Sequence, residues 1–246
     1  TKASGHIATA LRTDAHAAAD HSIADGFHAH PGSYATNATA IGYFANAQGY
    51  SSAAIGSNAT ALGDSSVAIG NTSLAGGEYS TAVGPFAAAT GYSATAVGDT
   101  ANAIGDYSTA VGKNSDAGGT QSSAFGNNAQ ATGAYSTAVG TSAHAYGSGD
   151  VAMGQNAVAN GTSYYGTSPA TAVGANAMAT NEGASAFGNS ATASGKYSTA
   201  LGQGTQATGK YSTAVGWRSS ASGYFSTAMG DLAIAIGNYS TAVGSH

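Results

Sequence analysis

A 14-residue repeat runs through almost the whole chain and limits its possible folds more than any other feature. The hexapeptide Tyr-Ser-Thr-Ala-Val-Gly occurs at 79–84, 107–112, 135–140, 211–216 and 239–244. Its looser form, Ala-apolar-Gly, occurs fifteen times, and the intervals are 14 residues except for one of 20. The fifteen motif glycines are Gly42, Gly56, Gly70, Gly84, Gly98, Gly112, Gly126, Gly140, Gly154, Gly174, Gly188, Gly202, Gly216, Gly230 and Gly244. Self-similarity at a fixed period indicates a repeat architecture.

Each repeat has small residues at fixed places. Alanine stands two residues before and five residues after every motif glycine up to Gly230, and a second glycine stands seven residues after it, except at Asn181. Fourteen residues with two glycines are too few for two helices, but they suit two short strands joined by tight turns. Successive coils then stack as parallel strands about 4.8 Å apart. The repeat therefore predicts an all-β, parallel β-roll.

The N-terminal segment fits the same repeat less well. Residues 1–36 are expected to form two degenerate coils, with Asp25 at the apolar position and Arg12 in place of the motif glycine. A two-residue insertion lies near Pro31, and a separate cap is the alternative reading of this segment. Residues 37–246 are expected to form the regular coils, with an insertion at about 162–170.

Strand alternation separates small and large side chains. In 80–84, Thr81 and Val83 lie on one face, and Ser80, Ala82 and Gly84 lie on the other. Two strands folded back within 14 residues leave room inside for alanine or serine, so the larger residues point outward. These larger residues form an apolar column, preceded by Leu11, of Ile41, Ile55, Ile69, Val83, Val97, Val111, Phe125, Val139, Met153, Val173, Phe187, Leu201, Val215, Met229 and Val243. So long an apolar stripe predicts self-association in a closed symmetric oligomer, either two-fold or three-fold.

The chemistry-bearing residues do not form a recognisable active site. The six basic residues are scattered, which argues against a nucleic-acid partner. Cysteine is absent, and no apolar run reaches the length of a membrane span. His28 and His30 would lie on one face of a strand, but no cysteine or nearby carboxylate pair completes a metal site with them. We therefore predict no catalysis, no cofactor and no metal.

Residues just after the motif glycines vary from coil to coil. Variable residues on a constant scaffold are where binding is tuned. Trp217 and Arg218 are of the types that dominate binding interfaces, and Tyr164 and Tyr165 lie in the insertion. These four are the candidate surface-binding residues.

The repeat resembles a known family. Ser-Val-Ala-Ile-Gly at 66–70, followed by Asn-Thr-Ser-Leu-Ala-Gly-Gly at 71–77, is similar to the head repeat of trimeric autotransporter adhesins, the family of the Yersinia adhesin head and Burkholderia haemagglutinin-like proteins. The resemblance implies a left-handed parallel β-roll, with three rolls side by side as a homotrimer. It also implies a place on the bacterial outer membrane, reached through a stalk and anchor absent from this chain. Its expected partner is a host cell-surface or matrix protein or glycan.

Two other functions compete with that of an adhesin head. An ice- or surface-binding solenoid would use a threonine ladder, and threonine stands three residues before the motif glycine in ten of fifteen coils. Those threonines share a face with the apolar column, which argues against an exposed ladder. A solenoid enzyme would need a six-residue period, or longer coils with a carboxylate cluster. An elongated trimer in solution would favour the adhesin interpretation, and a monomer would favour the ice-binding one.

Overall fold

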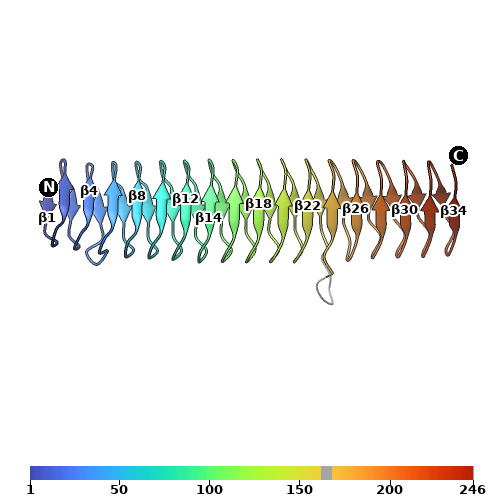
Figure 1. The fold of residues 1–246 in the computed structure, drawn as a ribbon, viewed down its shortest axis with the longest axis horizontal. Helices are drawn as coiled ribbons and strands as arrows, with labels where there is room; N and C mark the ends of the chain where they lie inside the picture. The colour runs from blue at the N-terminus through green and yellow to red at the C-terminus, as the bar shows by residue number, and fades with distance from the viewer. Residues whose placement is uncertain (162–167, 246) are drawn as a thin grey trace. The chain divides into compact units, whose positions relative to one another are not determined.

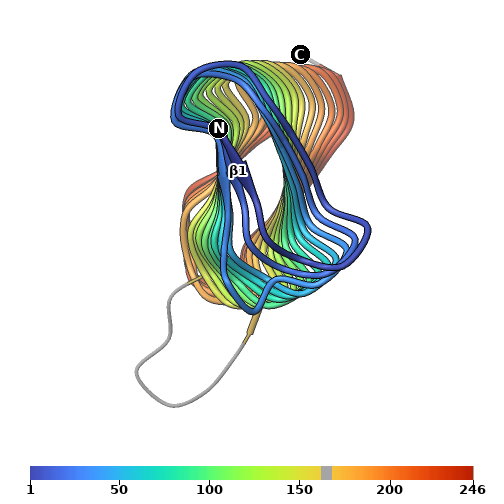
Figure 2. The ribbon, with the colours of Figure 1, turned by 90° about the vertical axis from the view of Figure 1, so that its left-hand side faces the viewer.

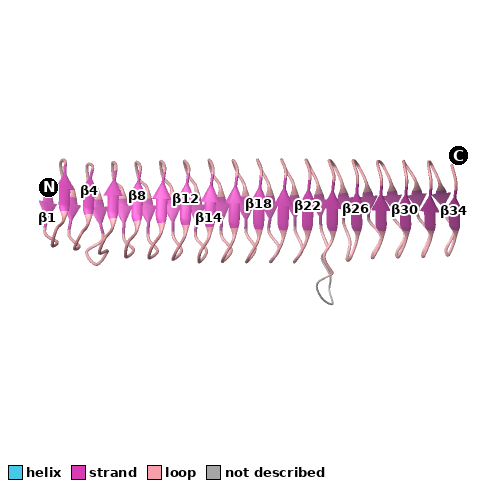
Figure 3. Cartoon of the chain, in the orientation of Figure 1, coloured by secondary structure: helices cyan, strands magenta, loops and turns pink. Residues whose placement is uncertain are grey.

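The computed structural model describes residues 1–161 and 168–245, which contain 34 short strands and no helix (Figure 3). No helix in this part of the chain is long and apolar enough to cross a membrane. The chain divides into two compact units, Thr1–Gln121 and Ser122–His246, and each is described by itself. Each coil contains one three-residue strand that ends before the motif glycine, here the motif strand, and one two-residue return strand.

The first unit holds strands β1 to β17 (Figure 1). Its motif strands are β2 (Thr9–Leu11), β4 (Ile23–Asp25), β6 (Thr39–Ile41), β8 (Ala53–Ile55), β10 (Val67–Ile69), β12 (Thr81–Val83), β14 (Thr95–Val97) and β16 (Thr109–Val111). Its return strands are β1 (Lys2–Ala3), β3 (His16–Ala17), β5 (His30–Pro31), β7 (Asn46–Ala47), β9 (Thr60–Ala61), β11 (Leu74–Ala75), β13 (Ala88–Ala89), β15 (Asn102–Ala103) and β17 (Asp116–Ala117). In Figure 2, which looks along this unit from its N-terminus, successive coils follow nearly the same outline.

The second unit holds strands β18 to β34. Its motif strands are β18 (Ser123–Phe125), β20 (Thr137–Val139), β22 (Val151–Met153), β24 (Thr171–Val173), β26 (Ser185–Phe187), β28 (Thr199–Leu201), β30 (Thr213–Val215), β32 (Thr227–Met229) and β34 (Thr241–Val243). Its return strands are β19 (Gln130–Ala131), β21 (His144–Ala145), β23 (Val158–Ala159), β25 (Met178–Ala179), β27 (Thr192–Ala193), β29 (Gln206–Ala207), β31 (Ser220–Ala221) and β33 (Ile234–Ala235).

All described strand pairs are parallel, and each residue pairs with its equivalent in the next coil. Val83 of β12 pairs with Val97 of β14, one 14-residue repeat later. The same register holds across the longer step, where Ala152 of β22 pairs with Ala172 of β24. The predicted all-β, parallel solenoid with a coil of about 14 residues is therefore confirmed.

The N-terminal motif strands join the same sheet. Leu11 of β2 pairs with Asp25 of β4, which in turn pairs with Ile41 of β6. The two extra residues of this region lengthen the turn after β5, and Tyr34 in that turn is 96% exposed. Pro31 takes the interior place that alanine has in the next coil, and it is fully buried.

The interior of the coils is built mainly from alanine and serine. Ala82 of β12 and Ala89 of β13 are both 0% exposed, and Ser80 just before β12 is equally buried. Val83 lies on the opposite side of the strand and stays partly exposed. The burial pattern thus agrees with the alternation predicted from the sequence: small side chains fill the coil, and large ones lie outside it.

Two columns of glycine let the coils approach closely. A Cβ added to Gly84, whose φ is +131°, would lie 2.4 Å from the carbonyl oxygen of Gly98. A Cβ added to Gly91 would lie 2.2 Å from the carbonyl oxygen of Gly105. Both contacts are with backbone, which has no room to move away. Glycine is therefore required at these positions by the packing of one coil on the next.

Most coils also turn twice through a residue with positive φ that is not glycine; Gly149, Gly183 and Gly204 take this place in three turns. Phe86, in the turn after β12, has a φ of +56°, and Ser93, in the turn after β13, has a φ of +50°. This conformation costs about 1–2 kcal/mol for an L-residue. The backbone N–H of Phe86 donates to Asn71 O at 2.9 Å, and that of Ser93 donates to Glu78 O at 2.8 Å. These bonds to the preceding coil hold the strained turns in place.

Candidate functional surfaces

The apolar column lies on the outer side of the motif strands in both units. Nine of its residues are exposed in the single chain: Ile41, Ile55, Ile69, Phe125, Met153, Phe187, Leu201, Met229 and Val243. The six valines Val83, Val97, Val111, Val139, Val173 and Val215 are half-buried. Because neighbouring strands are in register, these side chains form an unbroken apolar stripe within each unit. A stripe of this kind marks an interaction surface.

Threonines form a second column on the same side of the motif strands. Thr81, Thr95 and Thr109 pair in register, and each is half-buried. Each stands two residues before a member of the apolar column, so both columns face the same way. A partner that covers the apolar column would also cover these hydroxyl groups.

The outer side of the return strands is mostly polar. Eleven of the sixteen residues that begin β3 to β33 have polar or titratable side chains. Asn102 Nδ2 donates to Asp116 Oδ1 at 3.4 Å, and His144 Nδ1 lies 3.2 Å from Gln130 Oε1. Partial burial raises the pKa of the Asp116 carboxyl. Each unit therefore presents one apolar face and one polar face.

Four aromatic rings form a stacked column along one turn of the second unit. The ring of Tyr211 stacks on Tyr197 at 5.4 Å and on Phe225 at 4.6 Å, and Phe225 stacks on Tyr239 at 5.7 Å. Tyr197, at the start of the column, lies over Gly183, where an added Cβ would be 2.4 Å from its ring. The rings thus cover one another, and mainly their edges are left to solvent.

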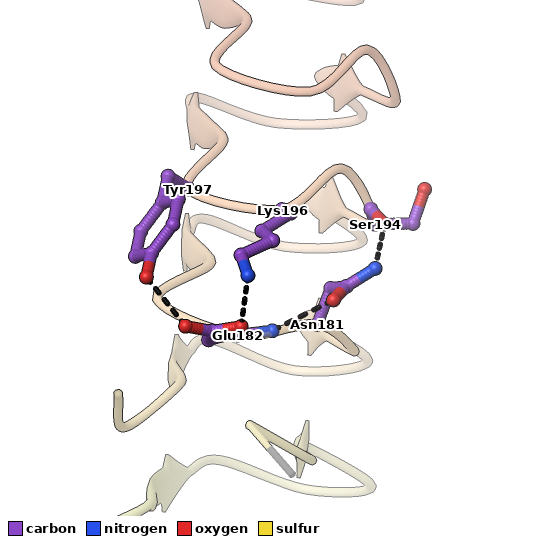
Figure 4. A network of polar contacts seen from close by, with 5 residues as sticks. All are labelled: Asn181, Glu182, Ser194, Lys196 and Tyr197. Carbon is purple, nitrogen blue, oxygen red and sulfur yellow. Dashed lines mark hydrogen bonds and ion pairs between the residues drawn. The ribbon is translucent and has the colours of Figure 1, made fainter. Parts of the chain in front are cut away.

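A polar network joins this column to the coil before it (Figure 4). Glu182 accepts a hydrogen bond from the Tyr197 hydroxyl and forms an ion pair with Lys196. The hydrogen bond with Glu182 raises the pKa of the Lys196 ammonium. Asn181, which replaces the usual second glycine, accepts from the Glu182 N–H at 2.9 Å and donates to Ser194 O at 3.2 Å. Asn181 therefore departs from the repeat pattern at a place where its side chain takes part in a local hydrogen-bond network.

Two of the four sequence-predicted binding residues lie in the described part of the chain. Trp217 and Arg218 follow the motif glycine of β30, and the Arg218 guanidinium lies 4.6 Å from the Trp217 ring centre. Trp217 is 42% exposed. Tyr164 and Tyr165 lie outside the described residues. Trp217 and Arg218 therefore form a surface pair whose role as a binding site stays a prediction.

A buried carboxylate, which sequence reasoning missed, supports the base of the insertion. Asp150 is 0% exposed and stands where Ser136 stands one coil earlier. Its carboxylate accepts hydrogen bonds from the backbone N–H groups of Gly147, Gly161 and Ala170 at 2.7, 2.9 and 2.8 Å. Gly161 and Ala170 flank the insertion, so Asp150 binds both of its ends. The sequence does contain a signal for this role, because Asp150 is a charged residue at an interior position just before the one 20-residue interval between motif glycines.

Aromatic and histidine side chains gather near the N-terminus of the first unit. Phe27 stacks on Tyr43 at 5.6 Å, and His28 stacks on Phe44 at 4.9 Å. His30, on β5, lies beside His16 on β3 at 5.4 Å. Burial, with a smaller contribution from His16, lowers the pKa of His30. No group of three metal-ligating side chains occurs among residues 1–161 and 168–245.

The sequence is similar to one family model along most of its length. The model for the YadA head domain repeat (2 copies) matches residues 33–59, 61–87, 89–115, 117–143, 145–163, 169–191, 193–219 and 221–246. Each full-length match spans two coils, so the model repeats in step with the structure. No curated protein matches the chain.

Proposed function

The chain belongs to the YadA head domain repeat family, and from this premise we propose that it is the head of a homotrimeric bacterial surface adhesin. In this proposal three left-handed rolls lie side by side, with their apolar columns against a common axis. The head stands on the bacterial outer membrane, carried by a stalk and an anchor. It attaches to a host cell-surface or matrix protein or glycan and catalyses no reaction.

The exposed apolar column is the observation that carries this proposal. Nine of its residues are exposed in a single chain, whereas the coil interior is filled mainly by the small side chains of alanine and serine. Full burial of a valine, leucine or isoleucine side chain stabilises by roughly 1.5–3 kcal/mol. Association along the column therefore supplies a core that one chain lacks. The polar return-strand face stays outward, where it can meet a partner.

Multivalency supplies the strength of attachment. Three copies of each surface site in one head allow weak single contacts to add up, because the second and third contacts form at high effective concentration. Trp217 and Arg218, together with Tyr164 and Tyr165 in the insertion, are the residues proposed for such contacts. A trimer would display each of them three times.

Sedimentation of the purified chain tests the assembly. We expect an elongated trimer that binds immobilised cells or matrix proteins, and weaker binding when the trimer is dissociated. A stable monomer with its threonine column exposed, which inhibits ice growth, would instead support the ice-binding alternative. A trimer that binds no cell, matrix protein or glycan would contradict the adhesive role.

A further inference from the structure

A groove of about 400 Å³ opens on the return-strand side of the first unit. Its walls include the Phe44 ring, the side chains of Asn46 on β7 and Thr60 on β9, and Asn58 in the turn between β8 and β9. We call it the Phe44 groove. Its volume falls in the range of about 300–1,000 Å³ typical of small-molecule sites. It lies away from the apolar column, so the proposed trimer would leave it open.

The Phe44 ring is stacked on one side only. Its ring contacts are with His28 and Phe27 of the preceding coil and with Tyr43 beside it. The next coil places Asn58 at the same turn position, where another ring would have continued the stack. Phe44 is consequently 44% exposed, and it borders the groove. The aromatic column of the second unit begins with Tyr197 over Gly183 and ends with Tyr239, which is 72% exposed.

The rest of the groove offers uncharged hydrogen-bonding groups. Asn46, Gln48, Asn58 and Thr60 present amides and a hydroxyl, and none of the eight described lining residues is Lys, Arg, Asp or Glu. Among the described residues, Asn46 Oδ1 is buried and has no hydrogen-bond partner, so it would reach a ligand only after its side chain rotates. Burial and the neighbouring His16 lower the pKa of His30, which favours its neutral imidazole. A neutral polyhydroxyl compound would find several hydrogen-bonding partners here, whereas an ionic ligand would meet no Lys, Arg, Asp or Glu side chain in the lining.

We propose that the Phe44 groove binds a hexopyranose residue of a neutral glycan, for which the galactose of N-acetyllactosamine serves as the probe. A galactopyranose carries its hydroxyls around the rim and presents a patch of C–H groups on one face, because its 4-hydroxyl is axial on the other face. The C–H face packs on Phe44, and the rim hydroxyls bond with Asn46, Asn58 and Thr60. This inference rests on the proposed adhesive function, since it names the class of ligand that the head recognises.

Binding of N-acetyllactosamine to the intact oligomer, followed by saturation-transfer NMR and calorimetry, tests this assignment. Phe44→Asn removes the ring but suits the positive φ of +52°, because Asn58 has the same conformation one coil later. Phe86→Asn makes the same change at an equivalent turn outside the groove, where φ is +56°. We expect Phe44→Asn to weaken binding at least tenfold, Thr60→Val to weaken it severalfold, and Phe86→Asn to leave it unchanged.

Two results would overturn the glycan assignment without touching the adhesive function. One is a trimer that adheres to cells but gives no saturation transfer to N-acetyllactosamine. The other is Phe44-dependent adhesion to a matrix protein that persists after enzymatic removal of its glycans, which would mean that the groove binds peptide. Failure of the wild-type trimer to adhere at all, with N-acetyllactosamine still bound in a Phe44-dependent way, would instead contradict the adhesin proposal alone.

Discussion

Arg12 Nε donates a hydrogen bond to Asp25 Oδ1 at 2.8 Å, and so the two N-terminal departures from the repeat neutralise each other. Asp25 lies in register between Leu11 and Ile41, at a place that is apolar in the regular coils. Arg12 stands where those coils have the motif glycine, with a φ of +75°. The charge placed in the apolar column thus comes with its own counter-ion.

Removing this counter-ion is expected to destabilise the N-terminal coils. Arg12→Gly suits the backbone but leaves Asp25 unpaired, whereas Arg12→Gly with Asp25→Val restores the regular motif. We expect the single change to lower the free energy of unfolding by about 1 kcal/mol or less, since the arginine side chain is exposed. The double change should exceed wild type in thermal denaturation. A double variant less stable than Arg12→Gly would contradict this account.

Two adjacent glycines should respond very differently to alanine. A Cβ at Gly77 would lie 2.0 Å from the carbonyl oxygen of Gly91, whereas a Cβ at Gly76 would lie 3.5 Å from Thr90 Cγ2. We expect Gly77→Ala to cost roughly 1–3 kcal/mol or more through overpacking. Gly76→Ala should be neutral or stabilise slightly, because it restricts the unfolded chain. Equal midpoints in urea for the two variants would refute the close approach of the coils.

Asp150 is expected to be essential for the base of the insertion. Asp150→Ala leaves three backbone N–H groups without an acceptor, and each costs about 1–3 kcal/mol when buried. Asp150→Asn keeps one oxygen and should cost less. Ser136→Ala, one coil earlier, removes a single bond from Ser136 Oγ to Gly133 O and is the control. Amide exchange at Gly161 and Ala170 should accelerate in Asp150→Ala, and exchange as slow as in Ser136→Ala would contradict this role.

A charge in the apolar column should disrupt assembly if the column lies at the trimer axis. Val139→Asp would bring three carboxylates together, each costing several kcal/mol when buried without a partner. Gln206→Asp is the control, because Asp116 occupies the equivalent return-strand position. We expect Val139→Asp to sediment as a monomer or melt early, and Gln206→Asp to remain trimeric. A Val139→Asp trimer with unchanged melting would place the axis elsewhere.

A fall in pH should lower the stability of the N-terminal coils, because it protonates His30. Its pKa is lowered in the folded chain, chiefly by burial and then by His16. Around and below the ordinary histidine pKa the unfolded chain therefore binds more protons, and stability falls as the pH drops through that range. His30→Asn, which copies Asn46 in the next coil, should weaken this dependence. Amide exchange of these coils at pH 7 and pH 5 measures the effect, which should be small because His30 is partly exposed.

The coil geometry could be predicted because steric limits act identically in every repeat. Two strands within 14 residues leave interior space only for side chains as small as alanine. The positions of Ala82 and Ala89 therefore predicted the inner side of the coil, and the position of Val83 predicted its outer side. Register followed from the constant spacing. The burial of Pro31 at a position that alanine occupies in the next coil was not predicted. The sequence showed the length of the two-residue insertion near Pro31 but not its exact place.

Other features depend on contacts that the repeat does not encode. The left-handed conformation of Phe86 contradicts its intrinsic preference and is imposed by bonds to the preceding coil. Asp150 acts on residues up to 20 positions away, across a segment without the motif. The groove beside Phe44 exists because one coil has a ring where the next has Asn58. The Asp150 contacts and the Phe44 groove arise from differences between neighbouring coils, which a periodic pattern averages out, whereas the turn conformation of Phe86 recurs along the chain.

The three bonds of Asp150 also bear on how a chain of near-identical coils finds its correct partner strands. A slip of one whole repeat would loop out one coil but would still leave alanine on alanine and glycine on glycine among the coils that pair. Among those coils, only an irregular one makes the free energy of the correct strand pairing differ from that of the shifted pairing. Asp150 can bond with both Gly161 and Ala170 in one strand register only, so this carboxylate would favour the correct register during folding.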